Sequence, residues 1–195
     1  MSDEPTLWIL MYGVLPLWLL AGFLDWVCHR AAHIETSTGP KESLIHLLMF
    51  AEMGLPLLAA IFLQVNAGVL LTMIVAFFLH EATAMWDVRY AVTARDVTPI
   101  EQHVHSFLEV LPLTATLFVV SRHWTQFEAL FGAGPDPADF SLAWKHTPLP
   151  VGYIVIVLTL MLVFEVLPYL EELFRGLRAN GGALAPGRTR GKGRP

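Results

Sequence analysis

Five long apolar segments constrain the fold of this chain more than any other feature of its sequence. A helix needs about 20 mostly apolar residues to cross the hydrocarbon core of a bilayer. Five stretches approach or exceed that length, over residues 6–29, 43–65, 67–88, 104–121 and 149–170. Only 15% of the 195 residues are charged, whereas soluble domains carry about 25%. The sequence therefore predicts an all-α integral membrane protein with about five transmembrane helices.

The segments are expected to form one domain. Only a very short loop separates the second segment from the third, so these two should form a tight hairpin. We expect a single transmembrane domain over residues 1–178, with similar hairpin repeats at about 6–66 and 67–130 and a fifth helix at about 147–178. Residues 179–195 are rich in Gly and Arg, a composition that predicts a disordered basic tail.

The distribution of basic residues predicts the orientation. Cytoplasmic loops of membrane proteins carry an excess of Lys and Arg. If the C-terminus is cytoplasmic, ten of the twelve Lys and Arg residues lie inside, and only Arg122 and Lys145 lie outside. We therefore expect an outside N-terminus and a cytoplasmic C-terminus.

One motif, P-x-E-x-x-x-H, occurs at the predicted start of two helices. Its residues are Pro40, Glu42 and His46 in one copy and Pro99, Glu101 and His105 in the other. The Glu and the His are four residues apart, which places them on one helix face. Part of the motif is a good helix start, because Pro99 lies in the first turn and Thr98 and Glu101 match a capping box. Capping leaves both histidines unexplained.

Six of the eight histidines are expected at the cytoplasmic membrane face, together with several acids. Ionisable residues inside a membrane domain face the bundle interior and are functional by default. We predict these metal ligands: His29, His33, Glu42, His46, His80, Glu101 and His105. Additional ligands or outer-shell partners could be Asp25, Glu81, Asp87, His103 and Glu109. His33 and Asp87 could equally be solvated helix ends, and His123 and His146 are expected to be ordinary interfacial residues.

The residue types indicate the kind of metal. Imidazole and carboxylate ligands without thiolate suit iron, manganese or zinc, and the single cysteine, Cys28, excludes a Cys-rich site. The candidates outnumber the three or four ligands of one zinc ion, and the repeated motif favours two ions. We expect no compensation by ion pairing, because Arg30, Arg89 and Arg95 lie at helix ends. The sequence thus predicts a four-helix bundle, made of the two hairpins, that holds two transition-metal ions, with iron favoured over zinc or manganese.

This gathering of histidines at the cytosolic ends of transmembrane helices resembles the membrane-bound histidine-rich di-iron proteins, the fatty acid hydroxylase and desaturase group. The resemblance covers roughly residues 25–109 and concerns arrangement, since the H-x-x-H-H boxes of that group are absent. It implies a di-iron oxidoreductase that hydroxylates or desaturates a lipid or another hydrophobic substrate. A separate electron donor would supply the electrons. Nothing in the sequence indicates a nucleic-acid surface.

Three other functions stay open. A membrane zinc hydrolase acting on a lipid would use three histidines and a carboxylate base, which could be His29, His80, His105 and Glu101. A haem protein would need paired imidazoles facing each other across a cavity. A metal or proton transporter would need polar residues in the outer half of the bundle, where residues 53–66 offer almost none. Glu52 and Glu165 lie deeper and could be outer-shell partners, proton carriers or substrate contacts.

Overall fold

The computed structural model describes residues 5–184. Within this range the regular secondary structure is all helical, apart from one isolated bridge between Leu63 and Trp144. Five helical spans are long and apolar enough to cross a membrane. They are Pro5–Ala31, Pro40–Phe62, Ala67–Ala91, Pro99–Arg122 and Val151–Ala179. The predicted all-helical class with five spans of this length is confirmed. The fourth and fifth spans extend well beyond the predicted apolar segments, by helical turns that carry charged residues.

Two of the spans are not regular α-helices along their whole length. Each contains a π-helical turn, and a proline follows it at the start of the next α-helix. The first span consists of α1 (Pro5–Ile9), η1 (Leu10–Val14) and α2 (Leu15–Ala31), and the last of α8 (Val151–Met161), η2 (Leu162–Val166) and α9 (Leu167–Ala179). Single π-helical turns inside α-helices occur frequently at functional sites.

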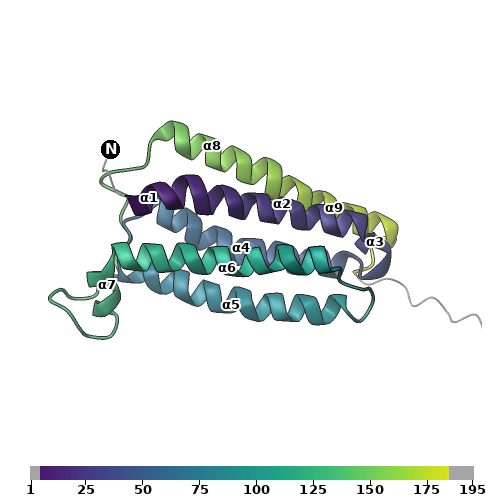
Figure 1. Cartoon of the computed structure of the whole chain (residues 1–195), viewed down its shortest axis with the longest axis horizontal. Coiled ribbons are helices and arrows are strands. Elements are labelled where there is room, and N and C mark those ends of the chain that lie inside the picture. The colour runs from purple at the N-terminus through teal and green to yellow at the C-terminus, as the bar shows by residue number, and fades with distance from the viewer. Residues whose placement is uncertain (1–4, 185–195) are drawn as a thin grey trace, which may run out of the picture.

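The spans run side by side along the long axis of the molecule (Figure 1). The second, third and fourth spans along the chain are the helices α4 (Pro40–Phe62), α5 (Ala67–Ala91) and α6 (Pro99–Arg122). Helix α4 packs against α5, α2 packs against α6, and α9 lies against both α4 and α2. The short helices α3 (Ile34–Ser37) and α7 (Trp124–Ala129) lie at opposite ends, which we name the inner end and the outer end respectively.

Capping residues fix where α5 and α6 begin. The side chain of Asn66 accepts a hydrogen bond from the backbone N–H of Val69 at 3.1 Å, so α5 starts directly after the tight turn that follows α4. The predicted capping box of Thr98 and Glu101 is present at the start of α6. Helix α9 ends at Ala179, and most of the predicted basic tail, from residue 185 onwards, lies outside the described residues.

The outside of the bundle is apolar. Large side chains on every span are more than half exposed, among them Leu20, Leu55, Phe78, Leu117 and Val155. Soluble monomers rarely expose apolar patches larger than a few hundred Å², so this surface suits the hydrocarbon of a membrane. The apolar core lies in the outer half, around Leu15, Ile61, Val157 and Met161. Buried polar side chains gather in the inner half.

Candidate metal centre

Eight ionisable side chains meet between the helices near the inner end. They are Asp25, His29, Glu42, His46, Asp87, Glu101, His105 and Glu172, and we name them the inner cluster. All but His105 are at most 3% exposed, and the His105 side chain is 17% exposed. Such burial is rare for carboxylates unless they are paired or bind a metal.

Asp25 on α2 connects two of the histidines. Its Oδ1 lies 2.9 Å from Nε2 of His105 and 3.4 Å from Nε2 of His29. Its Oδ2 accepts a hydrogen bond of 3.2 Å from the hydroxyl of Tyr169, which fixes the carboxylate plane. One ligand atom from each of Asp25, His29 and His105 lies within 4.8 Å of the others, a spacing that can hold a metal ion. Glu101 Oε1 is 3.6 Å from the same His29 nitrogen.

A second group of potential ligands overlaps the first at His29. It consists of His29, Glu42 and His46, again with ligand atoms within 4.8 Å of one another. The rings of His29 and His46 stack with their centroids 4.3 Å apart. Nε2 of His46 lies 3.3 Å from Oδ1 of Asp87. The two groups therefore border one shared space.

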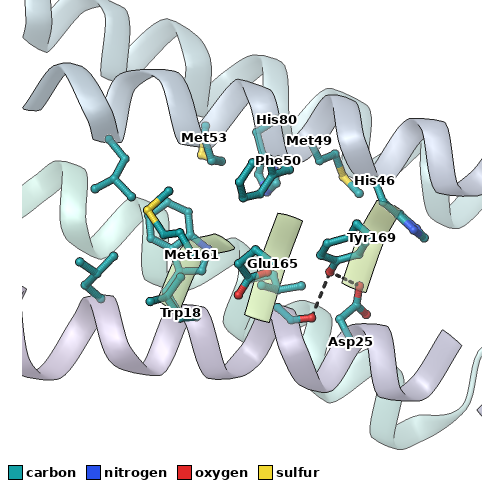
Figure 2. A pocket seen from close by; sticks show the side chains of 16 residues that line it. Trp18, Asp25, His46, Met49, Phe50, Met53, His80, Met161, Glu165 and Tyr169 are labelled. Atoms are coloured by element: carbon teal, nitrogen blue, oxygen red, sulfur yellow. Dashed lines mark hydrogen bonds between the residues drawn. The ribbon is translucent and has the colours of Figure 1, made fainter. Parts of the chain in front are cut away.

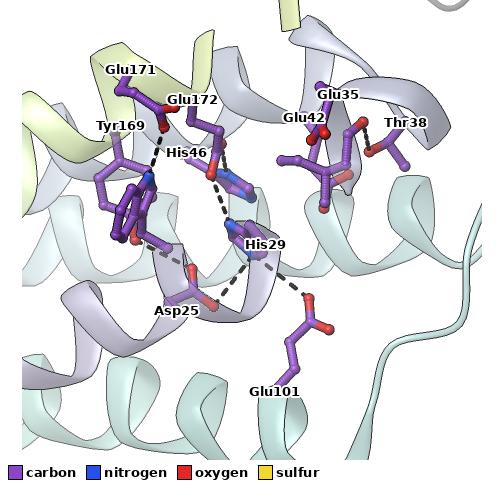
Figure 3. Close-up of polar contacts among 12 residues, drawn as sticks. Asp25, His29, Glu35, Thr38, Glu42, His46, Glu101, Tyr169, Glu171 and Glu172 are labelled. Carbon is purple, nitrogen blue, oxygen red and sulfur yellow. Dashed lines mark hydrogen bonds and ion pairs between the residues drawn. The ribbon is translucent and has the colours of Figure 1, made fainter. Parts of the chain in front are cut away.

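Glu172 on α9 holds both stacked histidines from the other side (Figure 3). Its Oε2 lies 3.1 Å from Nδ1 of His29, and its Oε1 lies 2.9 Å from Nδ1 of His46. A carboxylate at Nδ1 favours a proton on that nitrogen, which leaves the lone pair of Nε2 free. Histidines that ligate metals usually donate their second ring N–H to such a carboxylate.

The atoms that face the centre of the cluster lie opposite one another at ion-pair distances, such as 2.9 Å between Oδ1 of Asp25 and Nε2 of His105, and within the described residues they make no hydrogen bond of regular geometry. They are Nε2 of His29, Nε2 of His46, Oδ1 of Asp25, Oδ1 of Asp87 and Oε2 of Glu42. Five such imidazole and carboxylate atoms in one buried space are of the kinds that ligate divalent cations.

Arg95, in the connection between α5 and α6, supplies the one guanidinium inside the cluster. Its Nη2 lies 2.6 Å from Oε1 of Glu42 and 2.6 Å from Oε1 of Glu101. Burial alone would lower the pKa of Arg95, but the hydrogen bonds with Glu101 and Glu42 raise it above its ordinary value. The prediction that basic groups at helix ends would not compensate the acids did not foresee this position of Arg95, between Glu42 and Glu101.

The charge of the inner cluster remains negative. Five carboxylates and one guanidinium leave four negative charges when the histidines are neutral. One negative charge remains even when His29, His46 and His105 are all protonated. Arg30 and Arg175 lie at the periphery, where they pair with Glu171 and Glu35. A bound cation would offset the negative charge that remains.

The structure brings most of the predicted ligands together. His29, His46 and His105 meet with the glutamates of both copies of the motif, Glu42 and Glu101. From the second set of candidates, Asp25 and Asp87 belong to the cluster. Asp87 is 3% exposed and is thus no solvated helix end.

Five predicted residues lie elsewhere. His33 follows the end of α2 with a left-handed φ of 51°, which turns its exposed side chain towards Glu35. His80 is buried, but it lines a cavity beside the cluster. His103 and Glu109 are exposed on α6, and Glu81 is half-buried on α5.

Two residues of α9, in the fifth span, were not predicted, namely Tyr169 and Glu172. The expected site used four helices, whereas α9 contributes both the carboxylate that holds two histidines and the hydroxyl that holds Asp25. A signal was present, because Glu165, Tyr169 and Glu172 are four and three residues apart and so share one helix face.

The geometry also bears on the alternative functions. The face-to-face stacking of His29 and His46 leaves no space for a haem between the two imidazoles. The predicted three-histidine zinc set is incomplete, because His80 is not among the groups that could share an ion. The cavities that continue towards the outer end are lined mostly by apolar side chains, which do not suit an ion path.

The chain matches no protein-family model, no curated protein and no solved structure. A function must therefore be inferred from the inner cluster and its surroundings.

Proposed function

We propose that the chain is an integral membrane protein whose inner cluster holds two transition-metal ions, and that iron is the preferred metal. The observation that carries the proposal is the buried excess of four negative charges around five potential ligand atoms that make no regular hydrogen bond. Unpaired ionised groups at membrane depth cost several kcal/mol each. Divalent cations offset that cost, and their binding energy also contributes to folding.

The overlap at His29 supports two ions in one space. Glu172 occupies Nδ1 of His29, so this histidine can serve one ion only, through Nε2. Asp25 and His105 complete the group around that ion. The remaining ligands for a second ion are His46 and Glu42, with Asp87 3.3 Å from His46. Carboxylates between the two groups could bridge the ions, as in other four-helix carboxylate–histidine centres.

The surroundings favour chemistry on a hydrophobic substrate. Asp25, His46 and Tyr169 line one end of a cavity whose other walls are mostly apolar (Figure 2). Two iron ions would supply the activation of dioxygen for hydroxylation or desaturation, with electrons from a separate donor. Glu172 orients the two histidines, Tyr169 holds Asp25, and Arg95 neutralises part of the carboxylate charge.

The proposed orientation follows from the basic residues. The inner end carries Arg30, Lys41, Arg89, Arg95 and the end of α9, so the positive-inside rule places it in the cytoplasm. The metal centre would then lie at the cytoplasmic face, and the N-terminus outside. A cytoplasmic site is accessible to a soluble electron donor.

A single zinc ion is the second candidate, because one of the two groups of potential ligands is sufficient to bind it. Asp25, His29 and His105 offer three ligands, and Glu101 lies 3.6 Å from His29. A zinc-bound water activated by a carboxylate base is the arrangement of a hydrolase. This group replaces the three-histidine set expected from the sequence.

Elemental analysis separates these functions. The protein would be produced with iron, manganese and zinc all present, purified in detergent and analysed for metal per chain. The proposal predicts about two irons per chain. One zinc per chain would favour the hydrolase, and a folded protein without bound metal would overturn the metal centre altogether.

A further inference from the structure

The cavity beside the inner cluster contains two buried polar groups that the metal centre does not use. Its walls are largely apolar, with Trp18, Phe50 and Met53 among them. Glu165 on η2 and His80 on α5 also line it, and they are 6% and 7% exposed (Figure 2). Within the described residues, Oε1 of Glu165 and Nδ1 of His80 have no hydrogen-bond partner.

The backbone around Glu165 makes room for its carboxylate. Glu165 lies in the π-helical turn η2, which changes the direction of side chains relative to a regular helix. Its carboxylate packs directly over Gly22, where a Cβ would collide with both carboxylate oxygens. The hydroxyl of Tyr169 donates to the Gly22 carbonyl at 3.1 Å, so the two helices are held together at this point. The absence of a side chain at Gly22 and the contact of Tyr169 with the Gly22 carbonyl thus hold the Glu165 carboxylate in a fixed place in the apolar wall.

The cavity continues away from the inner cluster. Glu165 is one helical turn before Tyr169, or about 6 Å along the axis, and Tyr169 contacts Asp25. In the other direction, Leu15, Trp18, Met53 and Leu57 line both this cavity and a second apolar one nearer the outer end. The two cavities together form an apolar path that starts at the inner cluster.

We propose that Glu165 and His80 bind the hydroxyl group of a long-chain alcohol or hydroxylated lipid, whose apolar tail lies along the two cavities. A hydroxyl donates one hydrogen bond and accepts others, so the carboxyl oxygen of Glu165 and the ring nitrogen of His80 are both suitable partners for it. An alkane chain can satisfy neither. The role of this ligand as a substrate rests on the proposed metal centre, whereas its binding rests on the cavity alone.

Binding of an alcohol and of an alkane of equal length tests the proposal. The full chain in detergent would be titrated with each compound in competition with a labelled long-chain alcohol. One buried hydrogen bond contributes enough to predict about fivefold tighter binding of the alcohol. Equal affinity of the wild-type protein for alcohol and alkane would overturn the proposal.

Variants assign the preference to the two residues. Glu165→Leu and His80→Leu should each reduce the preference for the alcohol, and Glu165→Gln, which keeps an acceptor, should retain part of it. Glu109→Leu is the matched control, since this exposed carboxylate on α6 lies outside the cavity. If Glu165→Leu fails to fold, Glu165→Gln and His80→Leu decide. A preference that persists in all folded variants would also contradict the assignment.

The metal content of the same samples separates this proposal from the metal centre. An alcohol preference in metal-free protein would support the hydroxyl site even if the metal centre were wrong. Two irons per chain together with no alcohol preference would overturn only the hydroxyl site.

Discussion

The two ends of the bundle both carry histidines, but they surround them with different groups. At the inner end, carboxylates lie opposite Nε2 of His29, His46 and His105. At the outer end, His123 lies near the cations of Arg122 and Lys145, and His146 is exposed. Lys145 donates to the backbone carbonyls of Leu63, at 2.9 Å, and Ala60, so it caps the end of α4.

This difference shows what makes a histidine a candidate ligand in such a chain. Depth alone does not distinguish the two ends, because both lie where helices leave the apolar region. Glu172 holds His29 and His46 at Nδ1, and Nε2 of each histidine faces an acid. The outer histidines have no comparable carboxylate within the described residues. The predictions below test this contrast, from the largest expected effect to the smallest.

The first prediction concerns the side of the membrane, where the expected result is all-or-none. In a Cys28→Ser background, Asp136→Cys in the outer loop should react with a membrane-impermeant thiol reagent in intact cells. Thr36→Cys at the inner end should react only after permeabilisation, because the positive-inside rule places that end in the cytoplasm. The opposite pattern, or reaction of both sites in intact cells, would show that the proposed orientation is wrong.

The second prediction compares one histidine from each end. His46→Ala should remove about half of the bound metal or more, since it deletes a ligand and leaves Asp87 and Glu172 without their shared partner. Its free energy of unfolding should fall by about 3 kcal/mol or more. His146→Ala should change stability by no more than about 0.5 kcal/mol and should keep the metal. Metal analysis and reversible unfolding in mixed detergent measure both effects.

The third prediction uses adjacent glutamates on α9. Glu172→Gln should lower metal affinity by about 10–100-fold, because an amide no longer holds the ring nitrogens of His29 and His46 as a carboxylate does. Glu171→Gln is its control, since Glu171 is partly exposed and pairs with Arg30 and Arg175. The control should keep its metal affinity and lose less than about 1 kcal/mol of stability. Equal losses in both variants, measured by competition with a chelator, would argue against a special role for Glu172.

The sequence predicted the helices well for a simple reason. Each span consists of consecutive residues, so the apolar composition and the length of the segments were sufficient to find all five. The cluster was harder, because its members come from five helices and meet only in the folded bundle. Helical spacing correctly placed Asp25 with His29 and Glu101 with His105, since residues four apart share a face.

The misses concern information that helical spacing does not contain. His33 itself adopts a left-handed backbone conformation after the end of α2, and this conformation decides where its side chain points. Whether Arg95 pairs with Glu42 and Glu101 depends on the path of a connection. Glu172 was missed because it follows the apolar segment 149–170, although it lies within the predicted fifth helix at about 147–178.

The last prediction concerns the outer end and pH. Burial and the charges of Arg122 and Lys145 lower the pKa of His123 in the folded protein, whereas in the unfolded chain it should be about 6.5. As the pH falls through that value, the unfolded state binds the proton first, so the free energy of unfolding decreases. His123→Gln cannot take up this proton. Between about pH 8 and pH 5 the variant should therefore lose less stability than the wild-type protein, with unchanged metal content at neutral pH. Parallel pH profiles of unfolding would show that folding does not lower the pKa of His123.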